Sequence, residues 1–487
     1  MFARGPRATA VAALIAGALV ASGCATQPDY RPPALAAPAA WSAAVPLPDA
    51  AAAFPGDRWW TLLDDSAINE LVDHAMADSP SVAQAVARVD EARASLGSDA
   101  AQRLPAISLD GTATRARSLG TSAETSATTL ETTASAGLGL SWEIDLFGRV
   151  RKSVEAARHR LDARTADAAA ARLSLAAQVA NSVLALRACD FSRTVATEDI
   201  RSRESVLALT RRRVATGFVA PVDEARAQSG LAAVRTSLAL RNESCVRIVN
   251  GLSALTGRDA AQVRSAVPAA GTAAVMPVAP PVALALPAAV LAAHPAVVAA
   301  EREVAASWEQ IAVARAERLP RFDLAAAISG QWLRAGGSTL DFTTWALTPT
   351  LSAPLFDGGA GAAQVEGAQA RHRAAAATLR AVLRTTSQEV ENALAAVASS
   401  RERIVSTRES TDAAARTLAA TEAQWRAGAV SLFELEDARR QQSAAQDSAI
   451  TAAHDAAQAW VALVRAAGPT AITTESHAHV LPRLSAR

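Results

Sequence analysis

The 487-residue chain is poor in aromatic residues and carries almost no net charge. Aromatic residues make up 4% of the sequence, which argues against a many-stranded sandwich, because such strands favour aromatic and β-branched side chains. With 48 basic and 47 acidic residues, the net charge of +1 leaves no basic excess to neutralise the phosphates of a nucleic acid. After the N-terminal segment no uncharged run of 18 apolar residues occurs, which argues against a membrane-spanning helix.

Lysine and catalytic motifs are also scarce. Lys152 is the only lysine, which we attribute to overall composition. No nucleophile elbow, zinc-protease motif, phosphate-binding loop or dinucleotide fingerprint occurs, so we predict no catalytic residue, no metal ligand, no cofactor and no enzyme activity. What is abundant is alanine, with leucine, arginine, glutamate and glutamine, a composition that favours long helices.

The N-terminus predicts export and lipidation. Residues 1–23 have the pattern of a secretory signal, with two arginines before an apolar core too short to span a bilayer. Residues 21–24, Ala-Ser-Gly-Cys, resemble a bacterial lipobox, which implies that Cys24 receives diacylglycerol. Alanine rather than aspartate follows Cys24, as in proteins sorted to the outer membrane. Ordinary cleavage that leaves a free cysteine is the alternative.

An internal repeat organises the rest of the chain. Residues 103–105 recur at 318–320, an offset of 215, and Gly217 matches Gly428 at an offset of 211. Several such matches in one order indicate a tandem duplication. The domains that we predict are a lipidated segment at 24–65, a first repeat at 66–257, a linker at 258–286, a second repeat at 287–467 and a mobile tail at 468–487.

Each repeat shows the same order of elements. A helix ends at a proline, at about 80–103 and again at 295–318. Two stretches of alternating apolar residues then predict strands. A long helix follows and turns at a glycine into a returning helix. The predicted strands are about 106–116, 135–146, 321–332 and 342–353, the long helices 149–216 and 368–427, and the returning helices 222–256 and 431–467.

Strands of this length cross a bilayer when tilted. An open sheet edge cannot exist in lipid, because its backbone N–H and C=O groups would have no partners. Four strands do not close a useful barrel, whereas three copies of the chain supply 12 strands around a lumen. The alternative is a non-pore periplasmic coiled-coil lipoprotein scaffold that carries two small hairpin sheets.

Several motifs resemble the outer-membrane factor lipoproteins, the OprM/NodT branch of the TolC-like channels. These are Cys24, Pro28-x-Tyr30-x-Pro32, Trp59-Trp60 and Trp142-Glu143-Ile144-Asp145-Leu146-Phe147-Gly148-Arg149. The resemblance implies a mainly α fold with a membrane β-barrel: a homotrimer with a 12-stranded barrel in the outer membrane and a 12-helix periplasmic tunnel. It further implies docking to a periplasmic adaptor (membrane fusion) protein and an inner-membrane efflux pump, usually of the resistance-nodulation-division type. A duct for protein secretion shares this architecture and stays open as an alternative to small-molecule efflux.

The tip turns at Gly217 and Gly428 are the natural place for a gate at the periplasmic end. Glu434 and Asp437 are spaced i, i+3 and share one helix face. They resemble the family's Asp-x-x-Asp aperture motif, and a trimer turns each into a ring of three carboxylates. The alternative is an acidic turn that merely favours a helix start.

Two further pairs are candidates. By its spacing from Gly217, Asp223 falls where the family latches neighbouring helix pairs, and Trp425 replaces the family's tyrosine partner. Cys189 lies 27 residues before Thr216 and Cys245 lies 23 after Val222, so an antiparallel hairpin brings them within about one helical turn. A disulfide is therefore permitted in the oxidising periplasm, and two free buried thiols are the alternative.

Overall fold

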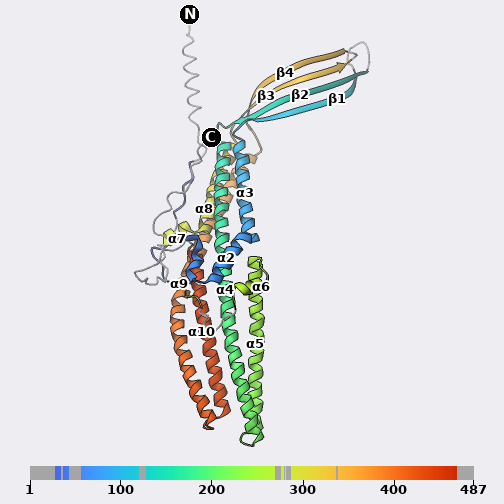
Figure 1. Cartoon of the computed structure of the whole chain (residues 1–487). Coiled ribbons are helices and arrows are strands. Elements are labelled where there is room, and N and C mark those ends of the chain that lie inside the picture. The colour runs from blue at the N-terminus through green and yellow to red at the C-terminus, as the bar shows by residue number, and fades with distance from the viewer. Residues whose placement is uncertain are drawn as a thin grey trace. The chain divides into compact units, whose positions relative to one another are not determined.

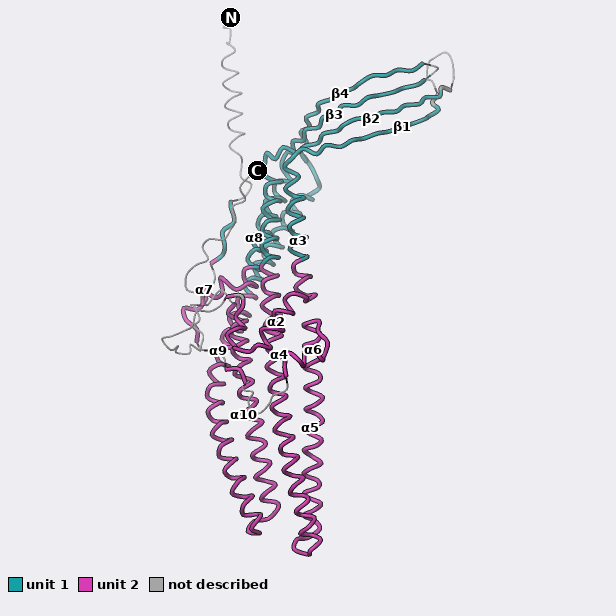
Figure 2. Tube along the Cα trace, in the orientation of Figure 1, with its two compact units in different colours: residues 1–33, 87–165, 299–380 teal, residues 34–86, 166–298, 381–487 magenta. Residues whose placement is uncertain are grey.

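The structure, a computed structural model, describes residues 28–34, 37–42, 56–119, 128–268, 276–278, 280, 287–335 and 338–468. The predicted signal at 1–23, Cys24 and the tail beyond Gly468 lie outside the described residues. The chain divides into two compact units, shown in Figure 2. Unit 1 consists of residues 1–33, 87–165 and 299–380, and unit 2 of residues 34–86, 166–298 and 381–487.

Unit 1 contains a four-stranded antiparallel sheet in the order β1-β2-β3-β4 (Figure 1). The strands are β1 (Ala106–Leu119), β2 (Thr128–Ile144), β3 (Arg321–Ala335) and β4 (Ser338–Ser352). Each repeat supplies one hairpin, and the two hairpins meet where β2 pairs with β3, for example Ala136 opposite Gly330. The strands, of 14 to 17 residues, are longer than predicted, because they continue at their hairpin ends into polar residues such as 128–134 of β2.

The helices repeat in matched lengths. The first repeat has α3 (Pro80–Ala101), α4 (Arg149–Ala215) and α5 (Pro221–Thr256), of 22, 67 and 36 residues. The second has α8 (Pro295–Ala316), α9 (Ala360–Arg426) and α10 (Leu432–Ala467), of the same three lengths. The long helices α4 and α9 each contribute residues to both units.

Helix α9 begins eight residues before the predicted start at 368. The predicted range excludes Gly361 and Gly367, which lie inside the helix in the structure. Asp357 initiates it instead, accepting hydrogen bonds from the backbone N–H groups of Gly359 (2.9 Å) and Gly361 (2.8 Å). These two N–H groups lower the pKa of the Asp357 carboxyl below its ordinary value. A carboxylate at a helix N-terminus also interacts favourably with the helix dipole.

Unit 2 contains four short helices that the sequence pattern did not predict. They are η1 (Gly56–Leu63), α2 (Ser66–Asp78), α6 (Ala260–Ala266) and α7 (Pro287–Ala293). The predicted linker at 258–286 therefore opens with a helix, which starts at a capping box between Asp259 and Gln262. Elements this short cover too few turns for apolar periodicity to show, whereas the Asp-x-x-Gln spacing was readable.

The core of unit 2 is apolar and gathers residues from both repeats. It includes Trp59, Leu71, Val183, Leu252 and Val461, none more than 1% exposed. Helix α4 contains an 18-residue window of mean hydropathy 1.3, long and apolar enough to cross a membrane by composition, but half of that window is buried in the chain. Because buried core helices pass the same test, we read this stretch as core.

The segment before η1 also packs into unit 2. Trp41 is 9% exposed and lies in a cluster with Val290, Leu394 and Leu463. The backbone N–H and hydroxyl of Ser42 donate to the Glu391 carboxylate, at 2.9 and 2.7 Å. Residues ahead of the first repeat are thus part of the packed structure.

Candidate functional site

The two helical hairpins of unit 2, α4–α5 and α9–α10, end in tips of the same construction. Gly217 and Gly428 have φ of 75° and 80°, in the left-handed region. The N–H of Gly217 donates to the Val214 carbonyl (3.0 Å), and the N–H of Phe218 donates to the Arg213 carbonyl (2.8 Å). The second tip repeats both bonds 211 residues later, at 3.0 and 2.9 Å. This pattern satisfies the last carbonyls of each long helix and requires a residue without a Cβ.

Asp223 and Glu434 occupy equivalent places, the third residue of α5 and of α10. The Glu434 carboxylate accepts the Ser431 N–H (3.1 Å), and Ser431 Oγ accepts the Glu434 N–H (3.3 Å), which forms a capping box. Asp223 has no such reciprocal cap, since Ala220 precedes α5, and its Oδ1 lies 3.5 Å from Arg226 Nη1. In this chain Glu434 therefore supports the start of its own helix.

Asp437 lies one turn further along α10. Its Oδ1 accepts from Arg440 Nη2 (2.9 Å) and its Oδ2 from Gln441 Nε2 (2.7 Å), both on the same helix. Its side chain is 45% exposed within one chain. Of the two carboxylates of the predicted gate, Asp437 is therefore the one not engaged at the helix terminus.

A buried ionic network lies above the tips. Arg203 of α4 contacts Asp199 on its own helix (3.0 Å) and Glu436 of α10. Arg439 of α10 donates to Glu422 of α9 (2.8 Å), and its Nη1 lies 3.8 Å from the other Glu436 oxygen. Both arginine side chains are only 4% exposed. The network therefore connects the first hairpin to the second through charges removed from water.

Helix α5 makes room for this network with a glycine. A Cβ at Gly230 would lie 3.0 Å from Arg203 Nη1 and 3.1 Å from Glu436 Oε2. Glycine inside a helix is about 1 kcal/mol less favourable than alanine. Its presence in the middle of α5 is explained by the space that the Arg203–Glu436 pair occupies.

Trp425 is buried where the two hairpins meet, beside residues of all four helices. It packs in an apolar cluster with Leu207, Leu231 and Leu435. The guanidinium of Arg213 lies 4.6 Å from the Trp425 ring centroid, and its nitrogens donate to the carbonyls of Trp425 (3.5 Å) and Arg426 (3.3 Å). A cation from α4 thus caps the C-terminus of α9, where the helix dipole favours positive charge.

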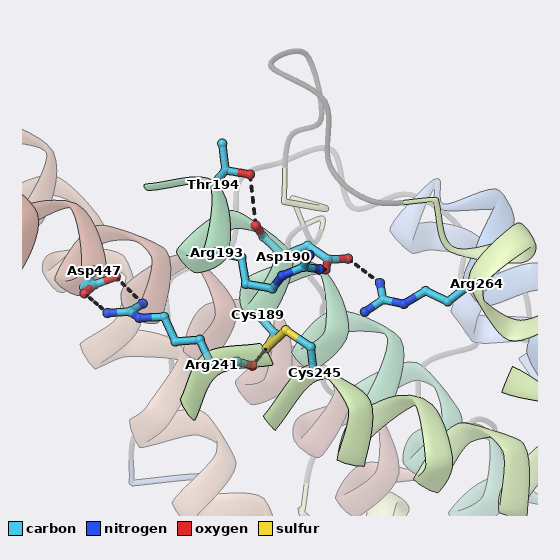
Figure 3. The surroundings of a disulfide bond; sticks show 8 residues. All are labelled: Cys189, Asp190, Arg193, Thr194, Arg241, Cys245, Arg264 and Asp447. Atoms are coloured by element: carbon cyan, nitrogen blue, oxygen red, sulfur yellow. Dashed lines mark hydrogen bonds and ion pairs between the residues drawn. A yellow bond between two sulfur atoms is a disulfide. The ribbon is translucent and has the colours of Figure 1, made fainter. Parts of the chain in front are cut away.

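A disulfide joins α4 to α5 higher in unit 2. Cys189 and Cys245 have Cα atoms 5.7 Å apart, and Cys245 is 1% exposed. Figure 3 shows ion pairs around this bond. Asp190 accepts from Arg264 of α6 (2.8 Å). Arg241 makes a two-point contact with Asp447 of α10, at 2.8 and 2.5 Å, and Asp447 raises the pKa of that guanidinium.

Comparison with known proteins shows which family has this architecture. The outer membrane efflux protein family model matches residues 71–258 and 286–469, once for each repeat. The chain belongs to the outer membrane efflux protein family. Among its relatives, Nodulation protein T of Rhizobium leguminosarum bv. trifolii is 26% identical over 92% of this chain and 95% of its own. Outer membrane protein OprJ of Pseudomonas aeruginosa is 28% identical over 78% of this chain and 79% of its own.

Solved structures agree with this membership. A membrane protein from Pseudomonas aeruginosa superposes with a TM-score of 0.81 at 27% identity, over 91% of this chain and all of that chain. The outer-membrane channel OprN gives 0.81 at 26% identity, over 92% and 100%. CmeC of Campylobacter jejuni, at 21% identity, shares the fold with a TM-score of 0.82. This family member is accordingly an outer-membrane channel protein whose four strands form its membrane part and whose helices extend into the periplasm.

The structure brings together only some of the residues selected from the sequence. Asp223, Trp425, Glu434 and Asp437 all lie near the tips, but Trp425 packs among leucines and against Arg213. The network of Arg203, Glu436 and Arg439 was missed. In the sequence its charged residues are spaced like those of any solvent-exposed helix face. The one indication of a buried network was Gly230, an unfavourable residue inside α5. Among the described residues no group of three or more His, Cys, Asp or Glu is placed to hold a metal ion.

Proposed function

We propose that three copies of this chain form the outer-membrane exit channel of a tripartite efflux system, which conducts small molecules passively from an inner-membrane pump to the exterior. One observation carries the proposal: β1 and β4 are sheet edges without a partner among the described residues. Their 14 and 15 residues are more than a bilayer requires. Since lipid cannot satisfy an open edge, β1 of one copy pairs with β4 of the next. Three copies give 12 strands and an aqueous lumen.

The proposal extends to the partners. In each copy α4, α5, α9 and α10 supply four helices, hence 12 in the trimer, as a periplasmic tunnel. We expect a periplasmic adaptor protein at this tunnel and an inner-membrane pump of the resistance-nodulation-division type, which would supply the energy. The names of relatives support small-molecule transport. They include a toluene efflux pump protein of Pseudomonas putida, 26% identical, and a pyoverdine export protein of Pseudomonas aeruginosa, 28% identical.

The closed state, on this proposal, is held by the buried network together with Arg213. Separating the hairpins would break the contact between Arg203 of α4 and Glu436 of α10, which joins them in a site that excludes water. Removing one partner of a buried ion pair costs about 3–5 kcal/mol. The resting channel is therefore closed, and a ring of three Asp437 carboxylates at the tip adds selection for cations.

Single-channel conductance in planar bilayers tests the proposal. Wild-type protein is expected to open rarely. Glu436→Gln weakens the contact between hairpins and is expected to open more often, whereas Asp437→Asn changes ion selectivity. Glu409→Gln, on an exposed position of α9, is the matched control and leaves both unchanged. Absence of conductance in every variant, with no heat-sensitive trimer band, would favour the non-pore scaffold instead.

A deletion strain separates efflux from protein secretion. Loss of the gene is expected to raise the accumulation of several dyes and drugs, and the wild-type gene restores their export. A strain that accumulates no small molecule but loses a secreted protein would contradict the efflux assignment.

A further inference from the structure

The sheet of unit 1 has one polar face and one apolar face. Successive side chains of a strand lie on opposite faces, and the pairing of the strands keeps the two sets apart. One face consists of the even-numbered residues of β2 and β3 and the odd-numbered residues of β1 and β4, and includes Leu138, Ile328 and Leu347. We name it the lipid face, because a barrel exposes its apolar side to the membrane.

The apolar part of the lipid face has the height of a bilayer core and ends at a tryptophan. On β3 it extends from Phe322 to Trp332, ten residues apart, which is about 34 Å along the strand. At a strand tilt of about 40° this corresponds to a height of about 26 Å, close to the apolar band of outer-membrane barrels. Because tryptophan favours the membrane interface, Trp332 marks the level of the lipid head groups.

Three arginines continue the lipid face beyond this level. Arg334 follows Trp332 by two residues on β3, and Arg115 and Arg117 lie on β1. Arg115 pairs with Thr132 of β2, which in turn pairs with Arg334. Two strand spacings, about 10 Å, therefore separate the Cα atoms of Arg115 and Arg334, and Arg117 lies about 7 Å further along β1. All three arginines are exposed, and we name them the arginine cluster.

The charge of the arginine cluster is not balanced within the chain. None of its members makes an ion pair in the part of the chain that the structure describes. On the described lipid face the one acidic residue is Asp341 of β4, which pairs with Trp332. Three cations against one anion leave positive charge for a ligand. Such charge is destabilising at the bilayer midplane but tolerated near the interface, where the cluster lies.

The cluster lies at the outer end of the sheet. Strand β2 leads into α4 and β4 leads into α9, so the helices join the sheet where these two strands finish. The arginines lie at the opposite end, near the last residues of β1 and β3. Since the helices extend into the periplasm, this end faces the exterior. The outer leaflet there contains lipopolysaccharide, whose lipid A carries phosphate groups.

We propose that Arg115, Arg117 and Arg334 form a binding site for the phosphate groups of an outer-leaflet lipid. Guanidinium groups donate two parallel N–H bonds to a phosphate, and the bonds are strengthened by the opposite charges. The acyl chains of the same lipid would lie along the apolar residues between the cluster and the helices, so that a single ligand complements both parts of the lipid face. The site requires the sheet to lie in the outer membrane, but it does not depend on conduction through the trimer.

Lipid A with and without its phosphates tests the site. Purified trimer in detergent is titrated with diphosphorylated lipid A and, separately, with dephosphorylated lipid A, and native mass spectrometry measures the bound lipid. The wild type is expected to bind the diphosphorylated form at least about tenfold more tightly, because arginine–phosphate pairs are charge-assisted. The triple variant Arg115→Gln, Arg117→Gln and Arg334→Gln is expected to bind the two forms equally.

A matched control removes the same charge elsewhere. Arg88→Gln, Arg401→Gln and Arg408→Gln together change three exposed arginines of α3 and α9, outside the sheet. This variant should keep the preference of the wild type for the phosphorylated lipid.

Two further variants keep the test decisive if the triple glutamine variant forms no trimers. Replacing the three arginines of the cluster by lysine keeps the charge but removes the planar fork, so an intermediate preference is expected. Arg334→Gln alone is expected to reduce the preference without abolishing it.

Three results would overturn the site: a wild type without preference for the phosphorylated lipid, a preference that persists in the triple glutamine variant, or release of the bound lipid by millimolar inorganic phosphate, which would indicate a site for the free anion. Conductance of the same samples reports separately on the proposed channel. A trimer that conducts but has no lipid preference would refute the site alone, and one that binds the lipid but never conducts would contradict the channel alone.

Discussion

At the scale of single residues, every buried Asp, Glu or Arg side chain in the part of the chain that the structure describes contacts an opposite charge. Arg203 and Arg439 are 4% exposed, and each contacts carboxylates from a neighbouring helix. A buried ion pair gains little net stability but is strongly destabilising when one partner is lost. Such a network suits a contact that must be either fully made or fully broken, as the hairpins of a gated tunnel require.

His294 gives a prediction at this scale. It precedes α8 and is 9% exposed, and its Nδ1 accepts the Ala296 N–H (3.3 Å), which requires that nitrogen to be unprotonated. Burial lowers the pKa of His294 below its ordinary value of 6.5. The hydrogen bond to the Arg465 backbone and the charge of Glu389 oppose this effect, whereas the charge of the Arg465 guanidinium adds to it. Because the folded-state pKa is below the unfolded one, its contribution to stability is complete above the unfolded pKa and is lost as the pH falls.

We therefore expect the melting temperature of the trimer to fall between pH 7.5 and pH 5.5. His294→Asn keeps a side-chain acceptor at this N-cap and should reduce the fall. A smaller slope should persist, because burial also lowers the pKa of His454. Equal slopes in the wild type and the variant would contradict this role.

At the scale of elements, the two hairpins have the same lengths and the same tip turns but differ in their covalent links. The first is closed by the Cys189–Cys245 bond across 56 residues, and the second hairpin contains no cysteine. A loop of that size predicts about 4 kcal/mol of stabilisation, since the bond restricts the unfolded chain. The bond lies in the same hairpin as Arg241, whose guanidinium contacts Asp447 of α10.

Replacing both cysteines by alanine is expected to lower the free energy of unfolding by about 2–5 kcal/mol. The measurement is denaturant unfolding of the helices by circular dichroism, with and without reductant. Reductant should destabilise the wild type and leave the double variant unchanged. If the wild type is fully reduced in denaturant and its free energy of unfolding still does not change, the bond contributes nothing.

At the scale of the whole molecule, the decisive feature is a sheet that one chain leaves incomplete. Every residue of β4 is exposed within one chain, including Trp345 at 78%. Aromatic side chains at that exposure suit the membrane interface. A subunit with two free edges and an uncovered sheet acquires partners for both only by assembly.

Cross-linking tests the assembly directly. In a background without Cys189 and Cys245, one cysteine placed in β1 and a second scanned along β4 should form disulfides between copies. Bands near 100 and 150 kDa are expected, two and three times the chain mass of 50.1 kDa. The same scan between β1 and β3, which are not neighbours in the sheet, is the control. Cross-links absent from the whole β4 scan would refute pairing of these edges.

Much of the fold was predictable from the sequence, because local physics decides it. Apolar alternation predicted the strands, and Gly217 and Gly428 predicted the turns between the long and the returning helices, since a left-handed C-terminus needs a residue without a Cβ. Strand ends and short helices were less predictable, because the pairing of β1 with β2 extends into polar residues whose own pattern is weak.

The tertiary structure alone decided which charges meet. Nothing in the spacing of Arg203 and Glu436, 233 residues apart, indicates that they share a buried contact. The same holds for Lys152 beside Glu309 and for Trp425 among leucines. The reason is physical: periodicity records which face of an element is apolar, whereas the partner of a polar side chain depends on how distant elements pack.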